Sequence, residues 1–475
     1  MELNRRGFLK GAAGFGIAVA GARRMFAAPA GTATGTPRLK FAVLSDIHVR
    51  DEETQQVFIK ALEWYRGQGV DAVLVAGDMA DHGLVSQLQL VADAWFKVFP
   101  DNKTPDGRPV TQLLEYGNHD VAKWKEKDIP DPAERARKLI NVDPKGCWER
   151  AFHEAYSPCF SKVVKGYTFI GAHWPGVGGL GDWLAANGKR LDPSLPFFYF
   201  QHPHPKDTCY GAWAWGHDDG ASTKALSPYA NAIALSGHSH YTLTDERTVW
   251  QGAFTSIGTS SLSYTSLDYN FRENAAGNPF GRKESRARQM SRVPTKDGKQ
   301  GMLFSVFDDH IRIERREFVW GESLGDDWIL PVGKAAEKPF VYAKRVPART
   351  APEFPADAQV KVAHVPTKAE KDKPAPAPTQ VEVTFPSAMT RAKCRVFEYE
   401  VQAVVVDDDV EMVAATRRAL APDFFLPESK AGKPGSCVFA LAELPKGVHI
   451  RFDVTPIECF GKKGRPIRSD ASFVA

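Results

Sequence analysis

Five short motifs combine residues that bind metal ions in many proteins, and each of them comes directly after an apolar run. Together they contain carboxylates, imidazoles and one carboxamide, which suit borderline metals such as zinc, manganese or iron. The motifs therefore predict a metal site. In chain order they are Asp46-Ile47-His48, Gly77-Asp78-Met79-Ala80-Asp81, Gly117-Asn118-His119-Asp120, the single His202, and Gly237-His238-Ser239-His240.

The number of candidate ligands exceeds what one ion needs, and two ions sharing a carboxylate would use all of them. Two metals roughly 3.5–4 Å apart can activate a bridging hydroxide and hold both ends of an in-line phosphoryl displacement. Residues two apart in an extended chain project to the same side, so two of the motifs can each present a pair of ligands. The candidates are Asp46, His48, Asp78, Asn118, His202, His238 and His240.

The apolar runs before the motifs are expected to be strands that alternate with helices, as in a layered α/β domain. Polar loops at the carboxyl ends of strands are where open α/β folds place their sites. A helix is expected over 54–64, and a hairpin over 302–307 and 311–318 that turns at Asp308-Asp309. The expected strands before the motifs are 41–44, 72–75, 113–116, 197–200 and 233–235.

The five motifs, in this order, resemble the pattern of the calcineurin-like metallophosphoesterase superfamily: D-x-H, G-D-x-x-D, G-N-H-D/E, H and G-H-x-H. The resemblance implies a four-layer αββα sandwich over residues 38–345 and two divalent or trivalent ions of zinc, manganese or iron. It also implies the ligands of each ion. The first would be held by Asp46, His48, Asp78 and His240, and the second by the bridging Asp78 with Asn118, His202 and His238.

The resemblance also implies roles for residues that bind no metal. His119 would assist at the phosphate or the leaving-group oxygen, and Asp81 would orient it, since an aspartate fixes the tautomer of an imidazole. Asp120 is expected to be a structural hydrogen-bonding residue. In the fourth motif a proline separates two histidines, so His202 and His204 are both candidate ligands, and His202 is preferred because it directly follows the apolar run.

The implied activity is a metal-dependent phosphoric ester hydrolase that works by attack of a metal-bound hydroxide. The segment around His202 resembles the fourth motif of phosphodiesterases, which slightly favours phosphodiesters, and a phosphomonoesterase with the same site is the alternative. An exported binding or adhesion protein on a non-catalytic scaffold is the alternative from another class. The expected substrate is a phosphate ester that is a small molecule or is linked to a glycan or lipid.

Two further segments could line a substrate pocket. His173 and Trp174 follow a strand-like run, and His217 lies in an aromatic-rich stretch. Solvated loop residues are the simpler interpretation of both segments, because polar side chains in connecting loops usually face water.

Residues 352–475 differ in pattern from the preceding chain. Apolar Phe397, Tyr399 and Val401 alternate with polar residues, which predicts short amphipathic strands and a small all-β sandwich. The end of the segment resembles the last strands of a fibronectin type III-like module. The low-complexity stretch 368–378 is either an interdomain linker or a loop inside this module. Six cysteines without a C-x-x-C pair are expected to be buried free thiols.

The chain has 475 residues and a formal net charge of +4, with 43% hydrophobic and 25% charged residues, which excludes wholesale disorder and a polytopic membrane protein. Residues 1–30 account for the whole net charge, so residues 31–475 are neutral and no nucleic-acid partner is expected.

Residues 1–30 resemble a bacterial twin-arginine (Tat) signal peptide, because Arg5-Arg6 is followed by a short apolar run and by Ala28-Pro29-Ala30. The expected location is periplasmic or exported. The apolar run is shorter than the roughly 20 residues of a membrane span.

Overall fold

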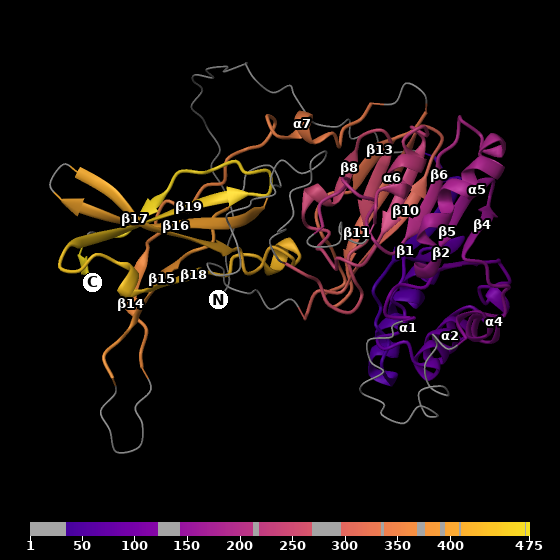
Figure 1. Cartoon of the computed structure of the whole chain (residues 1–475), viewed down its shortest axis with the longest axis horizontal. Helices are drawn as coiled ribbons and strands as arrows, with labels where there is room; N and C mark the ends of the chain where they lie inside the picture. Colours follow the sequence, from indigo (N-terminus) through magenta and orange to yellow (C-terminus); the bar gives the residue numbers. More distant parts are fainter. Residues whose placement is uncertain are drawn as a thin grey trace, which may run out of the picture. The chain divides into compact units, whose positions relative to one another are not determined.

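The computed structural model describes residues 35–121, 143–211, 218–267, 296–333, 337–367, 376–389, 395–407, 410–470 and 472–475 (Figure 1). Residues 37–475 form one compact unit. The expected signal peptide, residues 1–30, lies outside the described residues. No helix within the described ranges is both long enough and apolar enough to cross a membrane.

The first sheet has seven strands in the order β12-β11-β10-β1-β2-β3, with β13 also paired to β11. β1, β2 and β3 run parallel, while β10 joins β1 antiparallel from far along the chain. The pairing of β10 with β11 confirms the hairpin expected around Asp308-Asp309. The strands are β1 (Leu39–Leu44), β2 (Ala72–Val75), β3 (Thr111–Leu114), β10 (Gln300–Val306), β11 (His310–Glu317), β12 (Glu322–Ser323) and β13 (Trp328–Pro331).

The second sheet has six strands in the order β4-β5-β6-β7-β9-β8. Its central strands β5, β6, β7 and β9 are parallel, and the antiparallel β4 and β8 lie at its edges. The strands are β4 (Cys159–Val164), β5 (Tyr167–Ala172), β6 (Phe197–Gln201), β7 (Ala232–Ser236), β8 (Val249–Gln251) and β9 (Thr255–Gly258).

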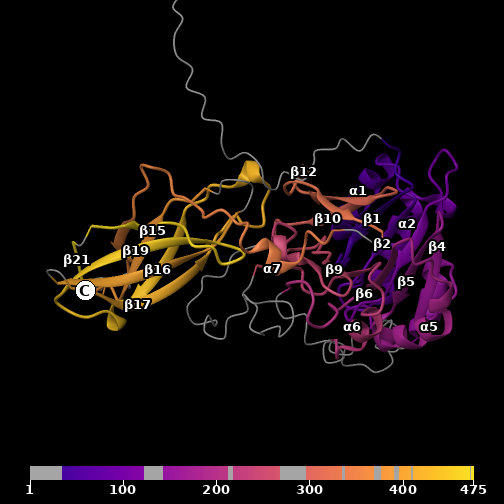
Figure 2. The same cartoon turned by 90° about the horizontal axis from the view of Figure 1, so that it is seen from above.

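The two sheets pack face to face between two layers of helices, as Figure 2 shows from above. Side chains alternate along each strand, so Phe41 points at the other sheet, where its ring contacts Phe169 and Phe198 at centroid distances of 5.1 and 4.8 Å. Ala42 and Leu44, on the opposite face, join the core under the helices. The predicted αββα sandwich is confirmed. The first sheet is covered by α1 (Glu52–Gly67), α2 (Val85–Val98) and α4 (Pro144–Phe152), and the second by α5 (Leu180–Asn187) and α6 (Ala221–Leu226).

Helix α1 begins directly after the first motif because Asp51 caps it. The Asp51 carboxylate accepts a hydrogen bond of 2.9 Å from the Thr54 backbone N–H, which satisfies one of the unpaired donors of the first turn. Its acidic first turn suits the positive end of the helix dipole. The other helices within the described ranges are short: α7 (Tyr342–Arg345) and the 3-10 helices η1 (Pro100–Asn102), η4 (Trp174–Gly179), η5 (Gly188–Arg190), η7 (Glu246–Thr248), η8 (Glu428–Lys430) and η9 (Leu441–Glu443).

The C-terminal region is a β-sandwich of a three-stranded and a five-stranded sheet. Rings from the two sheets meet in its core, with Phe439 5.4 Å from Phe452 and Phe385 4.7 Å from Tyr399. The sheets contain β14 (Lys361–His364), β15 (Gln380–Phe385) and β18 (Gly435–Ala440), and β16 (Val396–Asp407), β17 (Val410–Leu420), β19 (His449–Glu458), β20 (Ile467–Arg468) and β21 (Phe473–Val474).

The low-complexity stretch 368–378 falls between β14 and β15, and these two strands pair with each other. The stretch is therefore a connection within the β-sandwich and not a linker between domains. Most of it, residues 368–375, lies outside the described residues. The resemblance of this region to a fibronectin type III-like module stays a prediction.

A buried charged residue contributes to the packing between the β-sandwich and the two-sheet domain. Arg247 pairs with Asp245 at 2.6 Å, and its guanidinium stacks over Tyr210 at 3.9 Å and over Phe397 of β16 at 4.5 Å. Tyr210 and Tyr241 belong to the same hydrophobic cluster as the sandwich core. Burying a charge costs free energy unless the charge is paired, and here the Asp245 carboxylate and the stacked rings offset that cost.

Within the described ranges no disulfide joins two cysteines, which agrees with the thiols expected from the sequence. Four of them are buried and Cys159 is half-buried, while Cys394 lies outside the described residues. Cys209 illustrates their character, since burial raises the pKa of its thiol to about 12 and keeps it protonated.

Candidate metal centre

The five motifs meet at one edge of the sandwich. The first three follow β1, β2 and β3 of one sheet, and the other two follow β6 and β7 of the facing sheet. Because these five strands end at the same edge, loops that are up to about two hundred residues apart in the chain converge there. The structure brings six of the seven predicted ligands into two adjoining groups, and Asn118 lies in the third of these loops.

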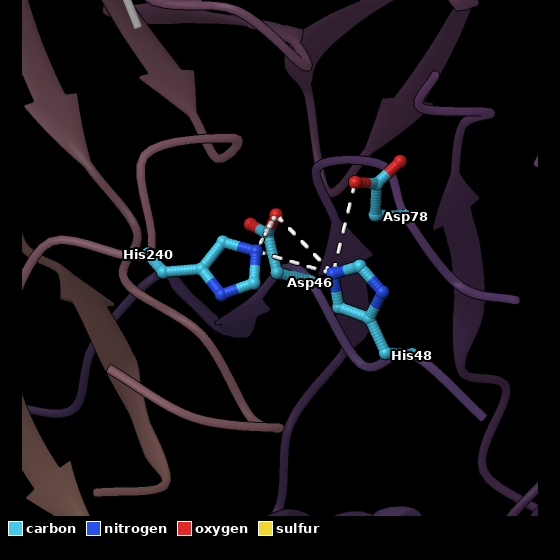
Figure 3. A group of neighbouring side chains, drawn as sticks. All are labelled: Asp46, His48, Asp78 and His240. Atoms are coloured by element: carbon cyan, nitrogen blue, oxygen red, sulfur yellow. Dashed lines mark hydrogen bonds and ion pairs between the residues drawn. The ribbon is translucent and has the colours of Figure 1, made fainter. Parts of the chain in front are cut away.

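One group of four side chains forms the first half of the site (Figure 3). Asp46, His48, Asp78 and His240 each offer a ligand atom, and these atoms all lie within 4.8 Å of one another. His240 Nε2 lies 2.9 Å from Asp46 Oδ1, and His48 Nε2 lies 3.7 Å from Asp78 Oδ2. The two imidazole nitrogens, His48 Nε2 and His240 Nε2, are 3.1 Å apart.

A second group shares Asp78 with the first. His202 Nε2 lies 3.0 Å from Asp78 Oδ2 and 3.1 Å from His238 Nδ1. Asp78 is the residue common to both groups, so its carboxylate would serve both ions if they were bound. Asn118 Oδ1 is buried and has no hydrogen-bond partner among the described residues, so it is available as a further oxygen ligand.

The donor set fits two metal ions. Two buried carboxylates and several imidazoles converge with their ring nitrogens turned toward one another, an arrangement that is costly unless cations compensate it. Oxygen and nitrogen donors of this kind suit zinc, manganese or iron. Asp46, His48, Asp78 and His240 would hold one ion, and Asp78, Asn118, His202 and His238 would hold the other.

The bridging position has strongly perturbed electrostatics. Burial opposes ionisation of Asp78, but the His202 imidazole and its hydrogen bond outweigh it and hold the Asp78 pKa far below its usual range. Burial likewise opposes protonation of His202, yet the carboxylates of Asp78 and Asp46 raise its pKa to about 10. In the metal-free chain His202 therefore carries a proton, which a metal ion would have to displace.

Five of the candidate ligands have a left-handed backbone, which non-glycine residues rarely adopt. The cost is roughly 1–2 kcal/mol for each residue. The pairs Asp46/His48 and His238/His240 thus converge through left-handed turns. The extended backbone that we predicted for these pairs from their spacing is wrong. The five residues, with their φ angles, are Asp46 (49°), His48 (49°), Asp78 (51°), His238 (68°) and His240 (52°).

Two motif glycines are required by close packing around these loops. A Cβ atom on Gly117 would overlap Asp78 Oδ1, and one on Gly77 would overlap the His202 ring. Gly77 also has a φ of +82°, which favours glycine. The glycines let the second and third loops approach the bridging carboxylate.

His119 and Asp81 lie beside the ligand set, but their contact differs from the expected one. His119 Nδ1 lies 2.8 Å from the backbone carbonyl oxygen of Asp81, and since a carbonyl can only accept, Nδ1 is the donor. His119 Nε2 lies 4.0 Å from Asp78 Oδ2. The Asp81 carboxylate instead contacts His48 Nδ1 at 3.0 Å and His82 Nε2 at 3.1 Å. Asp81 therefore orients His119 through its backbone and the ligand His48 through its side chain.

His204 lies outside both ligand groups. Its ring is buried, with Nδ1 3.1 Å from Cys209 Sγ and Nε2 3.0 Å from Ser239 Oγ. Burial lowers the pKa of His204 to about 4, so the ring is neutral. Of the two candidates in the fourth motif, the structure places His202 with the ligands and His204 behind them.

Asp120 joins the second and third loops. Its carboxylate accepts backbone hydrogen bonds from Met79 at 3.2 Å, Ala80 at 2.7 Å and Gly117 at 2.8 Å. Burial and the neighbouring Asp78 raise its pKa to about 7. The expectation of a structural hydrogen-bonding role agrees with these contacts.

Glu115, at the end of β3, is a buried carboxyl that no motif includes. Both of its side-chain oxygens lack a hydrogen-bond partner within the described ranges. Burial raises its pKa well above the usual value, so the group is neutral in the folded chain.

Two aromatic residues lie beside the site, and little or nothing in the sequence indicated their position. Trp174 lies 5.7 Å from the His238 ring, and Tyr264 lies 4.3 Å from the His240 ring. Tyr264 follows no motif, and Trp174 was interpreted as a solvated loop residue. Its neighbour His173 is buried, and its Nδ1 accepts the Tyr116 backbone N–H at 2.9 Å, so the solvated interpretation is wrong for His173. His217 lies outside the described residues.

Comparison with known proteins agrees with this geometry. Residues 39–242 match the model of the calcineurin-like phosphoesterase family. No curated protein matches the chain at a significant level. Among solved structures, a dimetal phosphatase from Danio rerio is 11% identical, covering 62% of this chain and 100% of its own, with a TM-score of 0.36. Purple acid phosphatase from yellow lupin is 11% identical, covering 62% and 53%, with a TM-score of 0.38.

These two structural likenesses are weak, so the assignment rests on the family model and on the ligand set. Together they support a metal-dependent phosphoester hydrolase with a dinuclear centre. Residues 39–242 thus match the model of the calcineurin-like phosphoesterase family, and they lie within a mixed α/β fold that a separate all-β region follows.

Proposed function

We propose that this protein hydrolyses phosphate esters with two bound metal ions, and that phosphodiesters are its slightly preferred substrates. The observation that carries the proposal is the convergence of two ligand groups on one carboxylate, that of Asp78. Two cations bound there would neutralise phosphoryl charge and make a water molecule more acidic.

The chain's own contribution centres on His119. Because its Nδ1 donates to the Asp81 carbonyl, Nε2 is the nitrogen directed toward the ligand set. The side chain is 26% exposed, so a substrate can reach it while its orientation stays fixed. When the imidazole also carries a proton on Nε2, this nitrogen is placed to donate a hydrogen bond to a phosphoryl oxygen or to give that proton to the leaving oxygen, while Nδ1–H stays bonded to the Asp81 carbonyl.

The preference for diesters is supported by the resemblance of the segment around His202 to the fourth motif of phosphodiesterases. The test measures release from bis-aryl and mono-aryl phosphates after chelation and addition of zinc, manganese or iron. We expect turnover of both substrates, with a higher kcat/KM for the diester. Absence of turnover with every metal would refute the enzyme proposal, and a higher kcat/KM for the monoester would refute the diester preference.

His119→Ala tests the assigned role, with His310→Ala on β11 as the matched control. The His119 variant is expected to keep its metal content and to lose turnover by roughly 10²–10⁴-fold, the usual contribution of a positioned acid or base. The control should match the unchanged protein. Loss of metal from His119→Ala would show that His119 is a ligand instead.

The alternative from another class, an exported binding or adhesion protein, is distinguished by metal content. The complete ligand set favours an enzyme, because a scaffold without catalysis has no need to keep every ligand. A purified chain with well under two ions per molecule, which metal addition does not correct, would favour the binding protein.

We also propose export through the Tat pathway, which is supported by Arg5-Arg6 and the small residues Ala28-Pro29-Ala30. The test compares the full chain with the double variant Arg5→Lys, Arg6→Lys in a bacterial host. The unchanged chain should appear in the periplasmic fraction, and the double variant should stay in the cytoplasm. Export of both proteins to the same extent would contradict the proposal.

A further inference from the structure

Each half of the ligand set has an aromatic ring beside it that is not itself a ligand. The Trp174 ring lies 5.7 Å from the ring of His238 and 6.1 Å from that of His202. The Tyr264 ring lies 4.3 Å from His240 and 6.2 Å from His48. One ring therefore flanks the ligands of each expected metal ion.

The Trp174 ring is held in place through the backbone at the ends of β3 and β5. The Trp174 N–H donates to the Tyr116 carbonyl at 2.9 Å, while the Tyr116 N–H donates to His173 Nδ1 at 2.9 Å. These reciprocal bonds tie the start of η4 to the chain just before the third motif. Burial lowers the pKa of His173 to about 3, so its Nδ1 remains an acceptor.

Tyr264 is tied to the fifth motif in a similar way. Its backbone carbonyl accepts a hydrogen bond of 3.1 Å from His240 Nδ1, and its N–H donates to Ser261 Oγ at 3.2 Å. The same residue thus fixes the tautomer of a ligand and presents a ring beside it. Tyr264 as a whole residue is 46% exposed, although His240 and His48 next to it are buried.

We propose that Trp174 and Tyr264 form an aromatic subsite that stacks against flat, aromatic substituents of the phosphate ester, and so sets a preference for aryl or heteroaryl esters. The inference rests on the proposed phosphoesterase function. Stacked or edge-on rings attract one another beyond simple burial, and ligand sites combine aromatic side chains with a few polar groups. Tyr264 is exposed here and Trp174 is half-buried. The rings position the substrate and take no part in proton transfer.

Binding of phenylphosphonate and methylphosphonate to the full-length, metal-loaded protein tests the subsite without turnover. Calorimetry should show tighter binding of the phenyl compound. Trp174→Leu and Tyr264→Leu should each weaken phenylphosphonate binding in the range of about twofold to tenfold, as expected for one lost ring contact. Methylphosphonate binding and metal content should stay within about twofold.

Conservative and remote variants make the test specific. Trp174→Phe and Tyr264→Phe keep a ring and should keep most of the phenyl preference. Trp320→Leu, on an exposed tryptophan outside the site, should change nothing. If the leucine variants lose metal or weaken both phosphonates equally, the rings only pack around the ligands and the subsite is refuted.

The two proposals fail in different ways. Equal affinity of the unchanged protein for both phosphonates, with ester turnover present, would overturn the aromatic subsite and leave the phosphoesterase proposal standing. Absence of turnover with every metal and every ester would overturn the phosphoesterase proposal itself.

Discussion

Replacement of Asp120 by alanine is the sharpest test of how the second and third motif loops are held. The substitution removes the acceptor of three backbone N–H groups, those of Met79, Ala80 and Gly117. A buried donor left without a partner costs about 1–3 kcal/mol. Allowing for relaxation of the loops, we expect the free energy of unfolding to fall by roughly 3–6 kcal/mol, which is a large share of a typical total.

Urea unfolding at pH 8 is the assay, because Asp120, with its pKa of about 7, is mainly ionised there. Asp120→Asn keeps one oxygen acceptor but turns an NH₂ group toward a backbone donor, so its loss should be intermediate. Asp93→Ala, an exposed aspartate on α2, is the control and should change stability by less than about 0.5 kcal/mol. A loss below about 1 kcal/mol in Asp120→Ala, with an unchanged m-value, would refute the reasoning.

Three further predictions concern the surroundings of the ligands. Gly117→Ala should lower the metal content measured by elemental analysis, because its Cβ would overlap the Asp78 carboxylate, whereas Gly67→Ala, with open space around it, should not. Glu115→Gln should stabilise the fold, and the gain in urea unfolding should be larger at pH 8 than at pH 5. Burial raises the folded-state pKa of Glu115, so the unchanged protein loses stability as pH rises above the unfolded value of about 4.3; a gain independent of pH would contradict this. Metal affinity should rise from pH 6 to pH 9, because the proton on His202 competes with the ion; a flat profile in a competition titration would show that His202 is not protonated in the metal-free chain.

The strands and the ligand set could be predicted from sequence because both depend on local signals. Each motif follows an apolar run, and strands such as β2 and β7 are buried on both faces, which makes those runs nearly continuous. The hairpin of β10 and β11 also has a local signal, namely two β-rich runs that turn at Asp308-Asp309. The pairing of β10 with β1 was not predicted, because partners so distant in the chain leave no mark in either segment.

The finer contacts of the site depend on backbone direction, which residue spacing does not encode. Asp81 was expected to orient His119 with its carboxylate, yet the loop turns that carboxylate to His48 and offers its carbonyl to His119. Tyr264 reaches the site only because the chain after β9 returns to the fifth motif. A tyrosine in a stretch without a motif gives no sign of that return.

The left-handed backbone of the ligands has a consequence for mutational scanning of this centre. Asparagine and aspartate tolerate a positive φ far better than alanine or β-branched residues do. Replacing His238 or His240 by asparagine would thus test mainly the lost ligand atom, whereas valine at the same position would also force the loop into another shape. Scans that use one replacement throughout would mix a chemical defect with a conformational one, and asparagine variants separate the two.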